Sequence, residues 1–462
     1  MTPVLLMAGA ISGIGLMLVL IIRFKLQPVL TLLIVSIFVA LLSGMPADKI
    51  VPAIEAGMGK TMGHIAIIIA LGAMIGKIVE ISGGAQVLAR DLIGKFGDRR
   101  IPLALTLAGF LIGIPVFFEV GVIMVMPLLY GVSNVTRRSL MVFALPMCVA
   151  MLTVHSFLPP HPGPAAASVQ IGADMGRILA FGVPITLLVC IVGYFISQHM
   201  TRRDFNYSVD IRLAVSGCDD GGVPASLEAS GEALPDAPAP EFWLIVGLIL
   251  FPIVLIMCGT TVSIFLPQKS FYYAVTQFLS APVTALLADT VLAGYCLGLR
   301  RGWSFEQVSS VIGSAVPGVA MVILIAGCGG VFGNILVQSG IGHVISDTLR
   351  NSGLPVLALA YILCLILRAV QGSTTVALVT TAGILAPLIA TFHFGPNRLA
   401  LLALAMGGGG LSASHVNDAG FWIFTKLTGI SVADGLKTWT VLTTVLGFLG
   451  FLTTAAMWLF FS

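Results

Sequence analysis

Long apolar segments recur along the whole chain, and their length constrains the fold more than any other feature. They lie near residues 4–22, 28–44, 63–81, 102–131, 139–157 and 177–199, and again near 242–259, 279–299, 315–338, 354–391, 398–413 and 437–460. Several approach the roughly 20 residues that an α-helix needs to cross a bilayer. The runs are continuous rather than alternating, which favours helices over a β-barrel. The sequence therefore predicts an all-α polytopic membrane protein.

The composition agrees with a bilayer as the solvent and excludes several classes of function. Only 9% of the residues are charged and 58% are hydrophobic, whereas a soluble domain carries about 25% charged residues. A net charge of +3 without a basic tract predicts no nucleic-acid partner. The seven cysteines lack C-x-x-C spacing, so we expect neither a metal site nor a disulfide framework, and no cofactor.

A polar segment at 200–241 separates two halves of the chain. It combines Arg202 and Arg203 with Asp219, Asp220 and a stretch rich in Pro, Ala, Ser and Glu, a composition typical of a flexible linker. We therefore expect a first transmembrane repeat at 1–199, a cytoplasmic linker at 200–241 and a second transmembrane repeat at 242–462.

The two halves share an ordered series of motifs. The first half has a G-x-x-x-G pair at 72–76 followed by Ser-Gly at 82–83, and the second half has the same pair at 329–333 followed by Ser-Gly at 339–340. Each half continues with a short amphipathic stretch, a proline, a split apolar run and a run that ends at a histidine-bearing polar segment. This order predicts an internal repeat.

The distribution of Lys and Arg predicts that the repeat is inverted. Cytoplasmic loops carry an excess of these residues, and Arg23, Lys25, Arg137 and Arg138 all follow apolar runs. The split run at 102–131 then enters and leaves on one side, and the second amphipathic stretch, at 341–353, lies on the opposite side from the first. Inverted repeats with paired broken helices are typical of secondary transporters, whose site lies near mid-membrane.

Polar residues interrupt the apolar runs at four places, paired between the halves, and such residues inside a membrane need a reason. The first interruption, at 117–121, holds Glu119 between apolar neighbours. Its carboxylate is a candidate for binding a proton or a cation; the alternative is an acid exposed at an interfacial turn.

The second interruption, at 153–162, contains His155 and His161 together with three prolines in four positions. The prolines forbid a regular helix. An imidazole titrates near neutral pH or binds a hydroxylated substrate; the alternative is a helix breaker whose histidines cap backbone groups.

The third interruption contains Arg368 and the hydroxyls of Ser373, Thr374 and Thr375. Free amides at the start of a half-helix, the helix dipole and these hydroxyls all favour a carboxylate, and the guanidinium of Arg368 suits one by its fork geometry. The alternative for Arg368 is a side chain that reaches the membrane interface.

The fourth interruption follows four consecutive glycines, at 407–410, and contains Ser414, His415, Asn417 and Asp418. The glycines permit an unwound segment and close backbone approach, and the polar side chains offer donors and acceptors to a polyhydroxy substrate. An ordinary loop is the alternative. Elsewhere, Asp289 lies within an apolar run, and Lys77 and Glu80 are expected near the end of the third run, within reach of water.

At these interruptions the chain resembles the gluconate permease (GntP) family of proton symporters. The matching segments are FFEVG at 117–121, VHSFLPPHPGP at 154–164, GSTTVA at 372–377 and SHVNDAGFW at 414–422. The resemblance implies import of gluconate or a related sugar acid across a bacterial inner membrane, with helical hairpins and a homodimer as expectations of the wider superfamily. Thr374 departs from the alanine usual in the family.

The leading hypothesis is therefore a proton-coupled symporter in which Glu119 and Asp418 carry the coupling. The residues expected to bind the substrate are His155, His161, Arg368, Ser373, Thr374, Thr375, Ser414, His415 and Asn417. The alternative substrates are other small hydroxy acids, namely idonate, galactonate, a glycerate-type acid or serine. An intramembrane enzyme is disfavoured because the sequence has neither H-E-x-x-H nor G-x-S-x-G; a channel or receptor is a third class.

Overall fold

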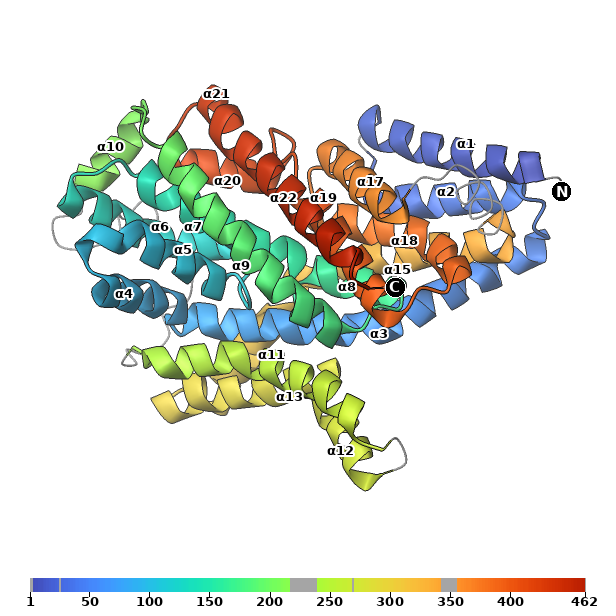
Figure 1. Cartoon of the computed structure of the whole chain (residues 1–462), viewed down its shortest axis with the longest axis horizontal. Coiled ribbons are helices and arrows are strands. Elements are labelled where there is room, and N and C mark those ends of the chain that lie inside the picture. Colours follow the sequence, from blue (N-terminus) through green and yellow to red (C-terminus); the bar gives the residue numbers. More distant parts are fainter. Residues whose placement is uncertain (1–2, 25, 217–238, 268–269, 342–354, 462) are drawn as a thin grey trace.

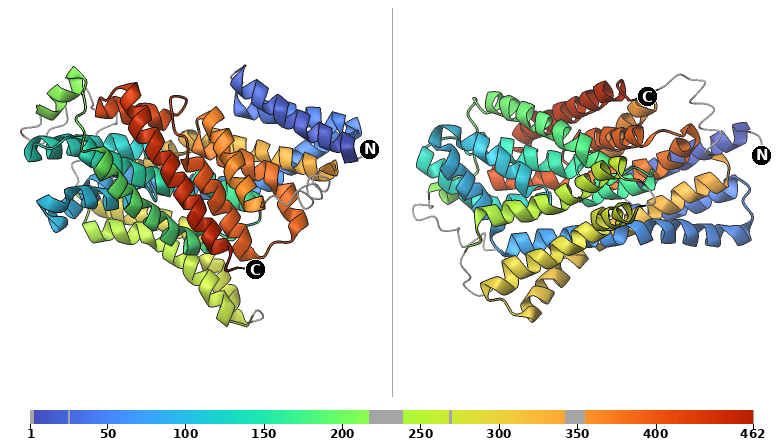
Figure 2. Two further views of the ribbon diagram at one scale, coloured as in Figure 1. Left: turned by 45° about the horizontal axis from the view of Figure 1, so that its top comes forward. Right: turned by 60° about the horizontal axis from the view of Figure 1, so that its bottom comes forward.

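The computed structural model describes residues 3–24, 26–216, 239–267, 270–341 and 355–461. Within these ranges the regular structure is entirely helical, which confirms the predicted all-α class. Nine helical segments of the described residues are long and apolar enough to cross a membrane, and three shorter apolar helices accompany them. Figures 1 and 2 show an elongated bundle in which the helices lie roughly along one another.

The first half contributes helices α1 to α9. Their bounds are α1 Pro3–Ile22, α2 Pro28–Leu42, α3 Ala47–Ile81, α4 Gly84–Phe96, α5 Ile101–Ile112, α6 Phe118–Thr136, α7 Met141–Phe157, α8 Pro162–Gln170 and α9 Met175–Met200. The apolar run expected at 63–81 is part of a longer helix, because α3 begins at Ala47. Its added turns carry exposed Lys49 and Glu55, which hid them from an apolar pattern.

The second half follows the same order after a short helix, α10 (Val209–Ser216). Its helices are α11 Phe242–Phe265, α12 Phe271–Ser280, α13 Pro282–Ala293, α14 Phe305–Ser314, α15 Val316–Gln338, α17 Val356–Gln371, α18 Thr374–Phe392, α19 Pro396–Leu411, α20 Ala419–Thr428, α21 Val432–Gly435 and α22 Val441–Trp458. The second amphipathic stretch, at 341–353, lies almost wholly outside the described residues.

The start of the segment at 200–241 is packed rather than free. Phe205 and Ile211 are buried, and the amide of Ser208 donates to the carbonyl of Gly429 at 2.8 Å. Helix α10 lies against α6. The remainder of that expected linker, 217–238, lies outside the described residues.

Two broken-helix hairpins, α5–α6 and α17–α18, occur where the sequence predicts them. The first break spans 113–117 around Pro115, and the second lies at Gly372 and Ser373, where Gly372 has a φ of 75° and Ser373 caps α18. Figure 1 shows α4–α6 at one end of the long axis and α17–α18 towards the other. The hairpins thus enter from opposite ends, as an inverted repeat requires.

Helices α3 and α15 form the most extensive helix pair, and small residues bring their backbones together. A Cβ on Gly57 of α3 would lie 2.8 Å from the carbonyl oxygen of Gly330 and 2.8 Å from the Cα of Val331. Both neighbours are backbone atoms and have little freedom to move. Close approach through small residues is the usual means of helix association in a bilayer.

We expect Gly57→Ala to destabilise the protein by about 1–3 kcal/mol, the usual range for overpacking. Thermal unfolding of the purified protein in detergent measures it. Gly59→Ala is the matched control, because it lies on the same helix and a Cβ there meets no atom of the described residues within 4 Å. Equal stability of the two variants would contradict the close α3–α15 contact.

Candidate functional site

A cavity of about 450 Å³ lies where the two hairpin breaks meet. It is lined by Ala73, Gly76, Lys77 and Glu80 of α3, by 116–120 at the first break, by Leu152 and His155 of α7, by Ser314, Ala315, Gly318 and Val322, by 372–375 at the second break and by 418–420 before α20. All four predicted interruptions therefore contribute residues to one cavity.

Three helices begin at the wall of this cavity. They are α6, which starts at Phe118, α18, which starts at Thr374, and α20, which starts at Ala419. The first amides of a helix lack intrahelical partners and carry the positive end of its dipole. Three such ends around one space create an environment that favours an anion.

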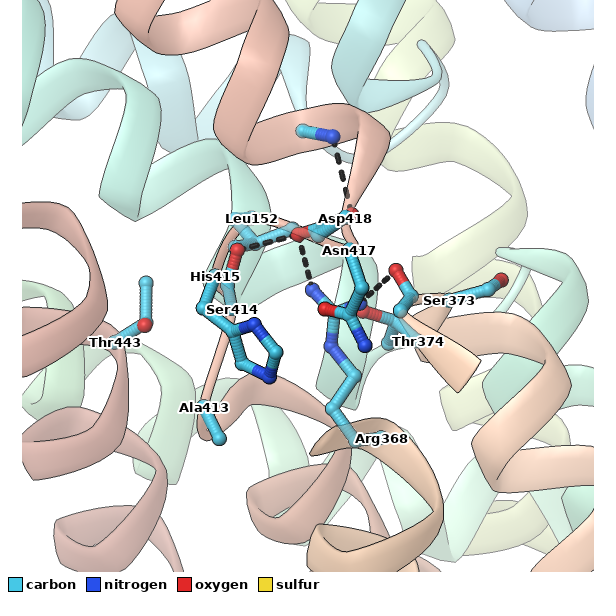
Figure 3. A network of polar contacts seen from close by, with 12 residues as sticks. Leu152, Arg368, Ser373, Thr374, Ala413, Ser414, His415, Asn417, Asp418 and Thr443 are labelled. Atoms are coloured by element: carbon cyan, nitrogen blue, oxygen red, sulfur yellow. Dashed lines mark hydrogen bonds and ion pairs between the residues drawn. The ribbon is translucent and has the colours of Figure 1, made fainter. Parts of the chain in front are cut away.

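Arg368 and Asp418 form a buried ion pair at the edge of the site (Figure 3). The guanidinium of Arg368 contacts the carboxylate of Asp418 through Nη2 and donates to the carbonyl of Gly372 through Nη1. Its side chain is 1% exposed, so it does not reach an interface. Arg368 does not line the cavity; it ties the end of α17 to the segment before α20.

The Asp418 carboxylate has further hydrogen-bond partners besides Arg368. It also accepts from the hydroxyl of Ser414, and its other oxygen accepts from the amide of Gly420 at 3.0 Å as the cap of α20. The Ser414 hydroxyl in turn accepts from the indole of Trp439 at 2.7 Å. Ser414 is thus engaged with protein groups and lies outside the cavity wall.

His415 and Asn417 cap the end of α17. His415 Nε2 lies 3.0 Å from the carbonyl of Ala369, and the amide of Asn417 donates to the same carbonyl at 2.7 Å and to that of Val370 at 3.2 Å. The last carbonyls of a helix have no partners within it. Neither side chain lines the cavity, and the structure gives both a role in joining the two breaks of the second half.

The two histidines of the second interruption lie together, with ring centroids 4.4 Å apart. His155 lines the cavity, and its Nδ1 has no hydrogen-bond partner among the described residues. His161 lies behind it and contacts the carbonyl of Gly113 through Nε2. Phe117 packs against both rings at centroid distances of 6.3 and 6.1 Å. Only His155 is therefore placed to touch a solute.

Glu119 and the hydroxyl residues of the second break line the same cavity. The structure records no ion pair for Glu119 within the described part of the chain, and the residue sits in the first turn of α6. Ser373, Thr374 and Thr375 also line this cavity. The Thr374 hydroxyl donates to the carbonyl of Gly410 at 3.1 Å, so this departure from the usual alanine joins α18 to the glycine-rich end of α19.

Two charged residues that the sequence had placed only near water, Lys77 and Glu80, also line the cavity. They form an ion pair at 2.7 Å and their side chains are 28% and 20% exposed.

By contrast Asp289, on α13, lies outside the cavity; it is fully buried, and neither carboxylate oxygen has a partner among the described residues. No grouping of His, Cys, Asp and Glu in the described ranges is suited to a metal ion.

A second cavity, of about 600 Å³, lies towards the other end of the same two central helices. It is lined by Gly57, Lys60 and Thr61 of α3, by Gly329, Gly330, Gly333, Asn334 and Val337 of α15, and by residues of α18 between Gly383 and Ala390 together with His393. The close contact of Gly57 on α3 with Gly330 on α15 lies at the wall of this second cavity.

Comparison with known proteins shows the relationships of the chain. The model of the family described as GntP family permease matches residues 4–460. Inner membrane permease YgbN of Escherichia coli is 44% identical over 99% of both chains. Gluconate permease of Bacillus subtilis is 36% identical over 95% of this chain and 96% of its own.

A solved structure shares the fold. The Alcanivorax borkumensis YdaH transporter, described as having an unusual topology, superposes with a TM-score of 0.61 over 89% of this chain and 88% of its own. The two sequences are 16% identical, so this likeness concerns the arrangement of helices alone.

Proposed function

The chain belongs to the GntP family of permeases, and we propose that it is a proton-coupled symporter importing gluconate or a related sugar acid across the bacterial inner membrane. Its family makes it a membrane transporter rather than an enzyme. The specific substrate and the coupling ion are the proposed parts. The lipid bilayer surrounds the protein. Assembly into a homodimer remains a prediction.

The cavity between the hairpin breaks is the observation that carries the proposal. Its volume of about 450 Å³ falls within the usual range for small-molecule sites. Three helix N-termini favour the carboxylate of a sugar acid, while Ser373, Thr375 and His155 offer hydrogen-bonding groups to its hydroxyls. The gluconate permease of Bacillus subtilis supports the same substrate class through its name.

The charges around the cavity support coupling to protons. Among the described lining residues, Lys77 is the one side-chain cation, and it shares the cavity with the carboxyl groups of Glu80, Glu119 and Asp418. Arg368 offsets Asp418. One carboxylate therefore remains in excess, and like charges at close range repel in a medium of low dielectric. Binding a further anion is easier when that carboxyl is protonated.

Two cavities at different ends of α3 and α15 support alternating access. Transport requires that a site open to one side and then the other, usually by movement of one bundle against another. The α3–α15 pair runs past both cavities, which makes it the element suited to stay in place while the hairpins move.

Counterflow in proteoliposomes tests the substrate. Vesicles loaded with unlabelled gluconate are expected to accumulate external labelled gluconate transiently, and external idonate and galactonate are expected to compete. Counterflow supported by serine or a glycerate-type acid but not by gluconate would overturn the substrate assignment. Absence of counterflow with any of these acids would overturn the transport proposal for this class.

Glu119→Gln is expected to separate transport from coupling. The variant keeps the shape of the site but has no titrating carboxyl, so counterflow should persist while accumulation driven by a proton gradient falls at least about tenfold. Glu306→Gln is the matched control, since Glu306 is also an acid in the first turn of a helix but is exposed outside the cavity. Normal accumulation in Glu119→Gln would exclude Glu119 as the coupling group.

A further inference from the structure

We propose that Lys77 is the cation that binds the carboxylate of the transported acid, and that Glu80 is an internal anion which occupies Lys77 when the site is empty. This inference rests on the proposed function and adds to it a binding residue and a competing group. The sequence alone had placed both residues merely within reach of water.

Elimination among the nearby cations points to Lys77. Arg368 is 1% exposed, and its terminal nitrogens contact Asp418 and the carbonyl of Gly372. Lys77, in contrast, lines the cavity, and its side chain is 28% exposed. Its ammonium shares the cavity with the start of α18, so one carboxylate could contact Lys77 and the first amides of that helix together.

The Lys77–Glu80 pair is poorly suited to stabilising α3. Pairs at this spacing favour a helix more when the acid precedes the base, and here the base comes first. Glu80 also lies one residue before the end of α3 at Ile81, where the negative end of the helix dipole disfavours an anion. The carboxylate is therefore held there chiefly by Lys77, at 2.7 Å.

Partner exchange at Lys77 follows from these contacts. A substrate carboxylate with stronger contacts to the helix amides can take the place of Glu80 on the ammonium. The displaced Glu80 stays within reach of water, since its side chain is 20% exposed. In the empty transporter, Lys77 and Glu80 neutralise each other, so no unpaired charge remains on α3 at this point. This favours the return of the empty site to the side of the membrane from which the substrate is taken up.

A double-mutant cycle tests this exchange through equilibrium binding of labelled gluconate to the purified full-length protein at neutral pH. Lys77→Gln should weaken binding about tenfold, the effect of losing one charged hydrogen bond. Glu80→Gln should tighten binding at least about threefold, because the competitor is gone. In the double variant the Glu80→Gln gain should vanish, since there is no cation left to release.

Two further variants separate a binding role from a fault in folding. Lys77→Arg should recover much of the affinity, and Glu55→Gln, an exposed acid on the same helix, should bind gluconate as the unaltered protein does. Weaker binding in Glu80→Gln, or unchanged binding in Lys77→Gln, would overturn the inference. If the unaltered protein fails to bind gluconate, the substrate proposal fails instead, and the cycle is run with the acid that supports counterflow.

Discussion

Arg368→Gln is expected to abolish transport and to destabilise the protein by about 3–5 kcal/mol, the usual consequence of removing one partner of a buried ion pair. The reason is that Asp418 loses its countercharge in a site that is almost closed to water. The link from the end of α17 through the Gly372 carbonyl is lost as well. Thermal unfolding in detergent and gluconate counterflow measure the two effects.

The matched controls for Arg368→Gln test whether pairing is the cause. Arg300→Gln removes an exposed arginine and should change neither stability nor counterflow. Adding Asp418→Asn to Arg368→Gln should restore part of the lost stability, because the unpaired charge disappears while asparagine still caps α20 well. Equal stability of Arg368→Gln and Arg300→Gln would contradict the buried pair.

Gly372→Ala is expected to disrupt the hairpin tip and remove most transport. Gly372 has a φ of 75°, a conformation that costs a residue with a Cβ about 1–2 kcal/mol. A Cβ there would also overlap the carbonyl oxygen of Asn417, which adds about 1–3 kcal/mol of overpacking. The second break would have to move away from the segment before α20, and the cavity wall with it.

Gly340→Ala separates these two contributions. Gly340 has a nearly identical φ of 76°, but a Cβ there meets nothing within 4 Å among the residues that the structure describes. It should therefore show only the conformational cost and retain counterflow. If Gly372→Ala retains as much counterflow and stability as Gly340→Ala, the close contact between the two breaks is not important for the site.

The breaks were predictable from sequence because their causes are local. Pro115 and the Gly372-Ser373 pair interrupt apolar runs with residues that end or begin helices, and both breaks occur in the structure. The series of motifs shared by the halves predicted paired hairpins in the same way. No comparable local signal marks the start of α3 at Ala47, because its first turns are polar and exposed.

The detailed arrangement of the site was not predictable, since it depends on contacts between distant segments. Arg368 was compatible with either a carboxylate or an interface, and the packing of α17 against the segment before α20 gives it a protein carboxylate, Asp418. His415 and Asn417 were expected at the substrate but cap α17. Lys77 is brought to the site by α3, which lines the same cavity as residues of both breaks.

Proton movement driven by gluconate tests the central claim most directly. Proteoliposomes carrying an internal pH indicator, with no initial pH gradient, receive external gluconate while labelled uptake is followed in the same vesicles. Symport through the cavity predicts that the interior acidifies in proportion to uptake. It also predicts that Glu119→Gln vesicles preloaded with unlabelled gluconate take up labelled gluconate by exchange without acidifying. Gluconate uptake with no change of internal pH in the unaltered protein would contradict proton-coupled symport.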